Sequence, residues 1–363
     1  MLIKIERRKK MAKYLKRGPK IVVIGGGTGT SVILRGLKKY TSNITAIITV
    51  ADDGGSSGKL REDLGMLPPG DIRSCILALA DTEPIMEQLL QYRFEEGTLK
   101  GQNFGNLLIA AMNEITGNFE EAIRKISDVL KVKGTVLPVT LEDITLIAEL
   151  ESGELVSGES QIPKVALEKK THIKRVSIHP PKVAPLEFAL EAIEEADAII
   201  LGPGSLYTSI IPNLLVEGLV EGICASNAIK IYITNIMTQP GETDNYTIMD
   251  HVEAILNHTN EEKNPIIDYI ISNNGKIPDY LVDKYRMEGA NLVPCEGEDS
   301  DCPYKFIIDD YVEVKKNYVR HDGDKLAYSI FKLIAEEKLS KDITRNMDYN
   351  HLMQLLRIYK DNS

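Results

Sequence analysis

A short aliphatic run at residues 20–24 (KIVVI) passes directly into Gly25-Gly26-Gly27-Thr28-Gly29 and then into a helical pattern. A continuous run of this length is typical of a strand buried in a parallel sheet. The same alternation returns later, where the run at 198–201 precedes a largely helical stretch at 206–226. Strands that alternate with helices predict a Rossmann-like α/β fold. We expect a doubly wound, mainly parallel sheet with helices on both faces.

Other segments follow the same patterns. Further strands are predicted at 43–50, 230–234, 266–272 and 291–294, and helices at 72–94, 105–131, 187–195 and after Gly323.

One stretch, from about 132 to 182, interrupts this rhythm. It holds short strand patterns at 145–150 and 154–157 joined at Ser152-Gly153, which predict a small β-hairpin, and a further edge strand at 174–178. We therefore expect a basic tail (1–18), one domain (19–338) with a hairpin insertion at about 132–182, and a C-terminal helical tail (339–363).

Composition narrows the class of protein. Of 363 residues, 43% are apolar, which is enough for a sizeable core and excludes disorder for the chain as a whole. The formal net charge of −10 argues against general binding to nucleic acid or anionic membranes. Residues 1–18 hold eight basic residues and one acid, so this tail carries +7 and the rest −17. A solvated tail is the usual explanation, and contact with an anionic surface is the alternative. If translation starts at Met11, half of the tail is absent.

Targeting signals are not evident. No apolar segment follows the basic stretch as in a signal peptide, and the uncharged run at 198–216 contains glycines, prolines and hydroxyl residues unsuited to a membrane span. The widely spaced cysteines have no metal-binding or disulfide signature, which favours free thiols in a reducing cytoplasm. They are Cys75, Cys224, Cys295 and Cys302.

The first glycine-rich loop has the composition of a phosphate site. Gly26, Gly27 and Gly29 allow close approach of the backbone, Thr28 adds a hydroxyl, and the helix beyond supplies free N–H groups. The loop matches neither a Walker A motif nor G-x-G-x-x-G. The alternative is a tight strand–helix turn without a ligand.

A second loop, after the strand at 43–50, begins with two acids. Asp52 or Asp53 is suited to a ribose, a substrate hydroxyl or Mg²⁺, and Lys59 and Arg61 are suited to phosphate. A solvated turn is the alternative. We favour function, because turn chemistry alone does not require this run of acids, glycines and serines.

The third loop precedes a predicted helix. Asp71 is placed to cap that helix. Arg73 lies in its first turn, where a positive charge opposes the helix dipole. Its partner is either an internal acid or an anionic ligand.

A fourth loop follows the strand at 198–201 and repeats the logic of the first. Gly202, Gly204 and Ser205 join strand to helix, so two anion-binding loops are expected at one edge of the sheet. A nucleotide diphosphate carrying a second group would span them. Asn106 and Asn235 are candidate contacts to a base or sugar, or else helix caps.

Nucleophilic and zinc chemistry have little support. There is no G-x-S-x-G elbow and no Cys/His pairing, and the six histidines are scattered without H-E-x-x-H character. His321 either reaches the cleft or precedes the last helix.

Several of these loops together carry a resemblance to a known family. The chain resembles the bacterial gluconeogenesis factor family (YvcK type), within the 2-phospho-L-lactate transferase (CofD-like) superfamily, from about residue 19 to 327. The matching segments are 21–29 (IVVIGGGTG), 49–58 (TVADDGGSSG), 68–73 (PPGDIR), 202–209 (GPGSLYTS) and 235–239 (NIMTQ). The last five residues of the 49–58 segment (GGSSG) and the PPGDIR segment separate the chain from the transferases. Gln102 stands where the family is expected to have His.

This resemblance implies a cytoplasmic regulator of cell shape and peptidoglycan synthesis during gluconeogenic growth, which binds UDP-sugars such as UDP-N-acetylglucosamine. Cell-wall synthesis proteins are the implied partners, and the transferase relatives suggest a homodimer. The implied site adds Tyr285, to stack on uracil, and Arg320, to pair with diphosphate.

Three function classes follow. The favoured one is a UDP-sugar-binding regulator without turnover, with no cofactor and no metal assigned. The alternative is a transferase that acts on a phosphorylated small acid, with Asp52 and Asp53 as the catalytic pair around Mg²⁺. A nicotinamide-dependent dehydrogenase rests on fold analogy alone, and the glycine spacing argues against it.

Overall fold

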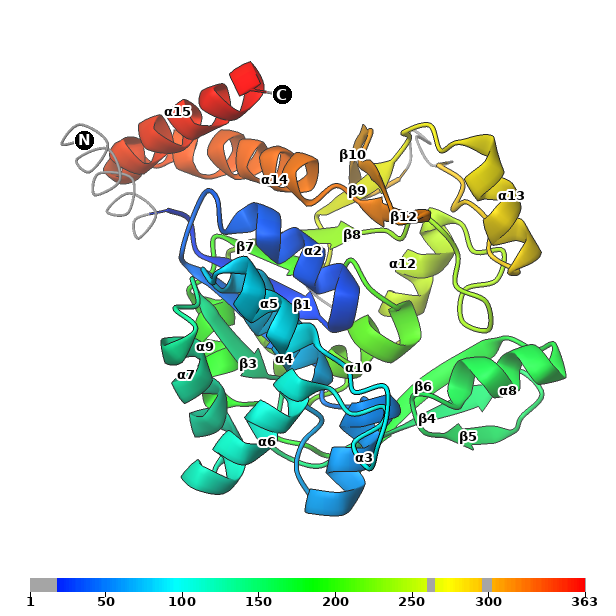
Figure 1. Cartoon of the computed structure of the whole chain (residues 1–363). Helices are drawn as coiled ribbons and strands as arrows, with labels where there is room; N and C mark the ends of the chain where they lie inside the picture. The colour runs from blue at the N-terminus through cyan, green and yellow to red at the C-terminus, as the bar shows by residue number, and fades with distance from the viewer. Residues whose placement is uncertain (1–17, 260–264, 296–301, 363) are drawn as a thin grey trace.

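The computed structural model describes residues 18–259, 265–295 and 302–362 (Figure 1). Within them, seven strands form one sheet in which every neighbouring pair is parallel, in the order β10-β9-β8-β7-β1-β2-β3. The bounds are β1 (Ile21–Gly25), β2 (Ile44–Ile48), β3 (Thr135–Pro138), β7 (Ala198–Leu201), β8 (Ile229–Ile233), β9 (Tyr269–Asn273) and β10 (Lys305–Asp309). The expected Rossmann-like fold is confirmed.

The order of strands reverses between β1 and β7. The chain first builds β1, β2 and β3 in one direction, then returns to place β7 on the other side of β1 and continues outward. In a doubly wound sheet, such a switch point leaves a crevice at the carboxyl ends of the two strands.

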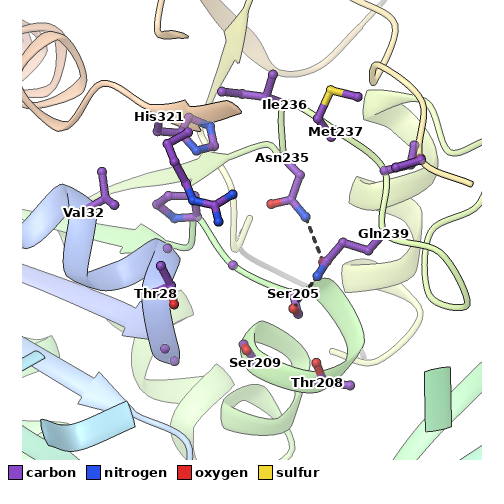
Figure 2. Close-up of a pocket in the computed structure, with 18 of the residues that line it drawn as sticks. Thr28, Val32, Ser205, Thr208, Ser209, Asn235, Ile236, Met237, Gln239 and His321 are labelled. Atoms are coloured by element: carbon purple, nitrogen blue, oxygen red, sulfur yellow. Dashed lines mark hydrogen bonds between the residues drawn. The ribbon is translucent and has the colours of Figure 1, made fainter. Parts of the chain in front are cut away.

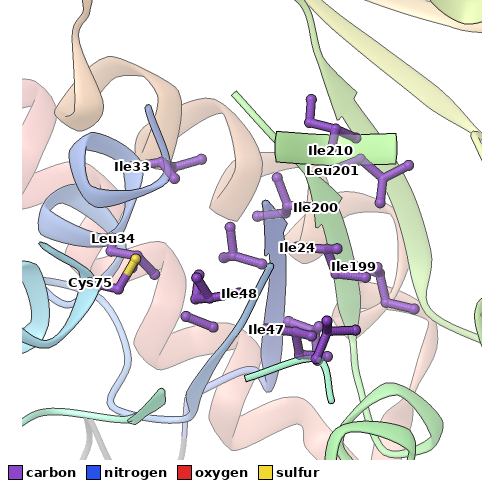
Figure 3. Packing of buried hydrophobic residues seen from close by; sticks show 14 of the residues in the cluster. Ile24, Ile33, Leu34, Ile47, Ile48, Cys75, Ile199, Ile200, Leu201 and Ile210 are labelled. Atoms are coloured by element: carbon purple, nitrogen blue, oxygen red, sulfur yellow. The ribbon is translucent and has the colours of Figure 1, made fainter. Parts of the chain in front are cut away.

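Helices connect and cover the strands. Figure 3 shows aliphatic side chains of β1, β2 and β7 lying between α2 and the π-helical turn η1, where most are fully buried. The bounds are α2 (Gly27–Leu37), α3 (Gly55–Leu64), α4 (Gly70–Leu79), α5 (Pro84–Gln91), α6 (Phe104–Thr116), α7 (Phe119–Val129), α9 (Glu187–Glu194), η1 (Leu206–Ile210), α10 (Ile211–Leu214), α11 (Leu219–Ala225), α12 (Ile248–Leu256), α13 (Asp279–Met287), α14 (Gly323–Glu337) and α15 (Asn346–Asn362), with 3₁₀ turns η2 (Leu339–Lys341) and η3 (Ile343–Arg345) before α15.

Three sequence expectations are wrong in detail. The helix predicted at 72–94 is two helices, α4 and α5, because the chain is extended before Pro84, and the helix at 105–131 is broken between α6 and α7 by a left-handed Gly117. Residues 291–294 form no strand: they contribute a single bridge, between Leu292 and Met237.

The insertion is larger than the expected hairpin. The strands β4 (Thr145–Leu150), β5 (Leu155–Ser157) and β6 (Ile173–His179) form an antiparallel sheet in the order β5-β4-β6, with α8 (Ile162–Lys169) between β5 and β6. The excursion starts after β3, because β3 pairs with β2 in the main sheet. Figure 1 shows this small sheet projecting from the main domain.

A second, smaller hydrophobic cluster lies apart from the main core. It packs α13 against the loop after β8 and against the hairpin formed by β11 (Val312–Lys315) and β12 (Tyr318–His321). Its buried members are Ile236, Met237, Ile277, Leu281 and Val319.

No single helix among the described residues has both the length and the apolar character needed to cross a membrane. The bent pair Leu206–Leu214 and Leu219–Ala225 meets those criteria of length and composition only when taken together.

Candidate functional site

A cavity of about 610 Å³ opens at the carboxyl ends of β1, β7 and β8, where the strand order reverses. One side is formed by the two glycine-rich loops, which we call the loop wall (Gly26–Gly29 with Pro203–Ser209). The other is formed by residues of α13 and β12, which we call the cap wall (Tyr285, Val319 and Arg320). Figure 2 shows Thr28, Ser205 and Ser209 of the loop wall, with Asn235 and His321 across the space from them.

The two halves of the loop wall touch each other. A Cβ atom on Gly29 would overlap the carbonyl oxygen of Pro203, so this close approach requires glycine. Gly27, with φ of +63°, starts α2 in the left-handed region, and the N-cap residue Gly26 has no side chain to cap that helix. The Gly27 N–H is held by the Asp71 carboxylate, so the N–H groups that follow it, at Thr28 and Gly29, are the ones placed at the cavity to receive an anion.

An acidic corner adjoins the loop wall. Asp52, Asp71 and Glu159 all line the cavity. Burial, together with the charge of Asp52, raises the pKa of Asp71 to about 7, although Arg73 and a hydrogen bond from the Gly27 N–H oppose this. Burial and the neighbouring acids likewise raise the pKa of Glu159 to about 8. These two carboxyls take up protons near neutral pH.

Asp71 does not have the role expected of it. The residue at the N-cap of α4 is Pro69, and the Asp71 carboxylate instead accepts a hydrogen bond from Gly27 of the first loop. Asp71 therefore connects the start of α4 to the first glycine-rich loop. The Nε and Nη1 atoms of Arg73 are enclosed and lack a hydrogen-bond partner among the described residues.

The insertion contributes to the same corner. The backbone N–H of Ser160 donates to Asp53 Oδ1 at 2.8 Å, so the loop after β5 closes onto the two acids and carries Glu159 with it. His258 also holds the insertion, because its Nε2 accepts the N–H of Val176 in β6 at 2.9 Å.

Ten of the thirteen predicted site residues line the cavity. They are Gly26, Gly27, Thr28, Gly29, Asp52, Gly204, Ser205, Asn235, Tyr285 and Arg320.

Three predicted residues do not line the cavity. Asp53 turns toward the insertion. Asn106 is 2% exposed, and its side-chain amide donates to Ser56 Oγ within the contact between α3 and α6. Gly202, with φ of +80°, makes the turn out of β7 and so positions Gly204 and Ser205.

The cap wall is held by its own contacts. The Tyr285 hydroxyl accepts the Val319 N–H at 3.1 Å, which leaves the ring half-buried beside the cavity. Arg320 is exposed, its Nη1 donates to the carbonyl of Val319 at 3.0 Å, and its guanidinium lies 5.1 Å from the centre of the Tyr318 ring. His321 Nε2 lies 3.1 Å from the Thr234 carbonyl, and burial lowers the pKa of His321 to about 4, so its imidazole is neutral.

Several cavity residues were not assigned to the site from the sequence. Thr208 and Ser209 belong to the 202–209 segment and Gln239 to the 235–239 segment, so their place in the family motifs could have indicated them. Glu159 gave no local signal, because it reaches the cavity only through the fold of the insertion.

A preformed metal site is not seen. No group of three or more His, Cys, Asp or Glu side chains in the described ranges is arranged to hold a metal ion. The Asp52 and Asp53 carboxylates point in different directions, since Asp52 lines the cavity and Asp53 accepts from Ser160 in the insertion.

Comparison with known proteins shows which family this chain belongs to. Residues 21–311 match the family described as 2-phospho-L-lactate transferase CofD. A relative from Thermoanaerobacterium thermosulfurigenes is 56% identical over 318 residues, which cover 87% of this chain and 97% of the relative. The gluconeogenesis factor of Bacillus subtilis is 48% identical over 320 residues, which cover 88% of this chain and 99% of that protein.

The chain belongs to the gluconeogenesis factors of the CofD family. A crystal structure of a UPF0052 family member from Bacillus halodurans matches this fold with a TM-score of 0.82 at 47% identity, covering 86% of this chain and 99% of that one. The resemblance noted from the sequence motifs is thereby confirmed. The cavity lies within the residues that match the family model except for Val319, Arg320 and His321, which follow residue 311.

Proposed function

We propose that this gluconeogenesis factor is a UDP-sugar-binding regulator that links nucleotide-sugar supply to peptidoglycan synthesis and cell shape during gluconeogenic growth. UDP-N-acetylglucosamine is the proposed ligand, and cytoplasmic cell-wall synthesis proteins are the proposed partners. The observation that carries this proposal is the pairing of two glycine-rich loops on one cavity, with Arg320 and Tyr285 on the facing wall.

The chemistry of the two walls suits such a ligand. The open N–H groups of α2 and the hydroxyls of Thr28 and Ser205 offer donors to a diphosphate, and Arg320 offers a charged donor from the other side. The half-buried ring of Tyr285 offers a face for a uracil base. A cavity of about 610 Å³ lies within the usual range for small-molecule sites.

Calorimetric titration with UDP-N-acetylglucosamine, with and without Mg²⁺, tests this proposal. We expect micromolar binding that Arg320→Ala weakens by about 100-fold, in line with loss of a charge-assisted pair. Arg286→Ala is the matched control, because Arg286 lies on α13 outside the cavity and pairs with Asp283 at 3.0 Å. Intact ligand should be recovered after overnight incubation. Failure of the wild-type chain to bind any UDP-sugar would refute the proposal.

The acidic corner favours one second candidate, a transferase that acts on a phosphorylated small acid. Asp52, Asp71 and Glu159 face the space where a transferred group would lie. Conversion of a phospholactate-type donor, abolished by Asp52→Asn in a protein of unchanged melting temperature, would support the transferase over the regulator.

A further inference from the structure

Three polar side chains from two segments form a continuous hydrogen-bonded chain along the cavity. The Gln239 side-chain N–H (Nε2) donates to Ser205 Oγ at 2.7 Å, and the Asn235 N–H (Nδ2) donates to Gln239 Oε1 at 3.3 Å. Figure 2 shows both bonds, with Gln239 between the loop wall and Asn235. We call these three residues the amide relay.

The backbone that carries the Gln239 side chain is held on both sides. Its backbone N–H donates to Thr243 Oγ1 at 2.9 Å, and its carbonyl accepts from the N–H groups of Glu242 and Thr243. Thr238, the residue before it, exchanges two bonds with Asn291, at 2.7 and 2.9 Å. The backbone on both sides of the Gln239 side chain is therefore fixed.

The direction of the relay decides what the cavity offers to a ligand. Because Ser205 Oγ accepts the Gln239 N–H, its own proton is free to donate toward the cavity. Because one Asn235 N–H is held by Gln239, this amide presents its oxygen and its second N–H, an acceptor beside a donor.

A reversed relay is the only other arrangement that keeps both bonds. If both amides turned over, Ser205 would donate to Gln239, and Gln239 would donate to Asn235 Oδ1. Ser205 would then present only lone pairs to the cavity. An anion on the loop wall requires a donor from Ser205, so its presence selects the first direction and, through Gln239, fixes the orientation of Asn235.

We propose that Gln239 is a positioning residue that couples phosphate binding at Ser205 to the reading of an amide edge by Asn235. The ligand class is a phosphate ester that carries an N–H beside a C=O, as in the imide of uracil or an N-acetyl group. This inference rests on the proposed nucleotide-sugar site and names the feature that the site reads.

A double-mutant cycle of Ser205→Ala and Asn235→Ala, measured by calorimetry with UDP-N-acetylglucosamine, tests the coupling. We expect each single substitution to weaken binding by about 10-fold, the effect of one or two lost hydrogen bonds, and the double substitution to weaken it by clearly less than the product. In a Gln239→Met background the two effects should multiply. A purely structural role of Gln239 would lower affinity without changing this interaction.

Titrations with different ligands show whether Asn235 contacts the sugar or the base. If Asn235 reads the sugar, Asn235→Ala erases the preference for UDP-N-acetylglucosamine over UDP-glucose; if it reads the base, it erases the preference for UDP over CDP. Gln239→Asn, whose shorter amide cannot span both partners, is the second test variant, and Gln91→Met on α5 is the control for a distant glutamine. Melting temperatures establish that each variant is folded.

Two results would overturn the relay. One is a multiplicative cycle in the wild-type background, and the other is retention of both ligand preferences in Asn235→Ala. Either result, obtained with a wild-type chain that binds UDP-N-acetylglucosamine, leaves the proposed function in place. A wild-type chain that binds no UDP compound overturns both proposals.

Discussion

The two walls of the cavity pack against different hydrophobic clusters. The loop wall rests on β1 and β7, whose side chains belong to the main hydrophobic core and are at most 2% exposed. The cap wall rests on five buried residues of the separate small cluster, around Leu281 and Val319. Because a region that opens locally is one with few buried contacts, the loop wall should be the rigid side of the site and the cap wall the side that yields.

The largest expected effect comes from separating the two loops within the rigid wall. In Gly29→Ala, the added Cβ overlaps the Pro203 carbonyl, so one loop must shift. We expect a loss of about 3 kcal/mol in the free energy of unfolding and about 100-fold in ligand affinity. Urea denaturation and calorimetry measure both.

The matched control for this change lies in the other loop. A Cβ on Gly204 would meet no atom closer than 3.6 Å, so Gly204→Ala should leave stability within about 0.5 kcal/mol of wild type. Equal destabilisation by the two substitutions would show that contact between the loops is not what makes the wall rigid.

A smaller effect should follow from a cavity in the small cluster. Leu281 is fully buried there, and Leu281→Ala should cost about 2 kcal/mol, the low end for a buried leucine, because a small cluster can partly close around the missing side chain. Because the cluster is separate, amide hydrogen exchange should accelerate in α13 and in the hairpin of β11 and β12, while β1 and β7 stay protected. Ile200→Ala in β7 is the control and should accelerate exchange throughout the sheet. Faster amide hydrogen exchange throughout Leu281→Ala, β1 and β7 included, would contradict the proposal that the cap wall opens independently of the loop wall.

The smallest effect is a pH dependence located at the loop wall. The raised pKa values of Asp71 and Glu159, about 7 and 8, mean that both carboxyls gain negative charge between pH 6.5 and 9. New charge beside a bound diphosphate costs about 1–2 kcal/mol, so affinity should fall roughly 10-fold over this range without added metal. Asp71→Asn should flatten much of the profile. Affinity that is constant or rises with pH would show that these acids do not face the anion.

The same pKa values carry a consequence for stability. A carboxyl whose pKa is raised by folding stabilises the native state when protonated, so this contribution is present below about pH 4 and is lost as pH rises through 7 to 8. Binding measurements at high pH therefore need a melting curve beside them.

The loop wall was predicted from local sequence patterns, whereas the cap wall was predicted only from the family resemblance, for a physical reason. Each glycine-rich loop is local: a buried strand, a turn and a helix start are consecutive, so Gly26 and Ser205 could be placed without knowing the fold. Tyr285 and Arg320 stand in no such local pattern and were assigned only through the family resemblance. Glu159 was missed, because it joins the site through a contact between the insertion and the Asp53 loop.

Errors of detail have a similar origin. Asn106 follows a glycine at a helix start, as a ligand contact would, yet its side chain turns to Ser56 between two helices. Local sequence does not state which neighbour a helix will pack against. The break before Pro84 was available in the sequence, since proline disfavours helix in the residue before it, but the apolar spacing on either side favoured one long helix.

The position of β7 beside β1 also sets a condition on synthesis of the protein. A nascent chain that ends before residue 198 can pair β1 with β2 and β3, but it lacks the second loop, and one that ends before residue 318 still lacks β12 with Arg320. Contacts between such distant segments form late in folding. The cavity is thus completed only when nearly the whole chain has left the ribosome, so the proposed ligand could bind only to molecules whose synthesis is nearly finished.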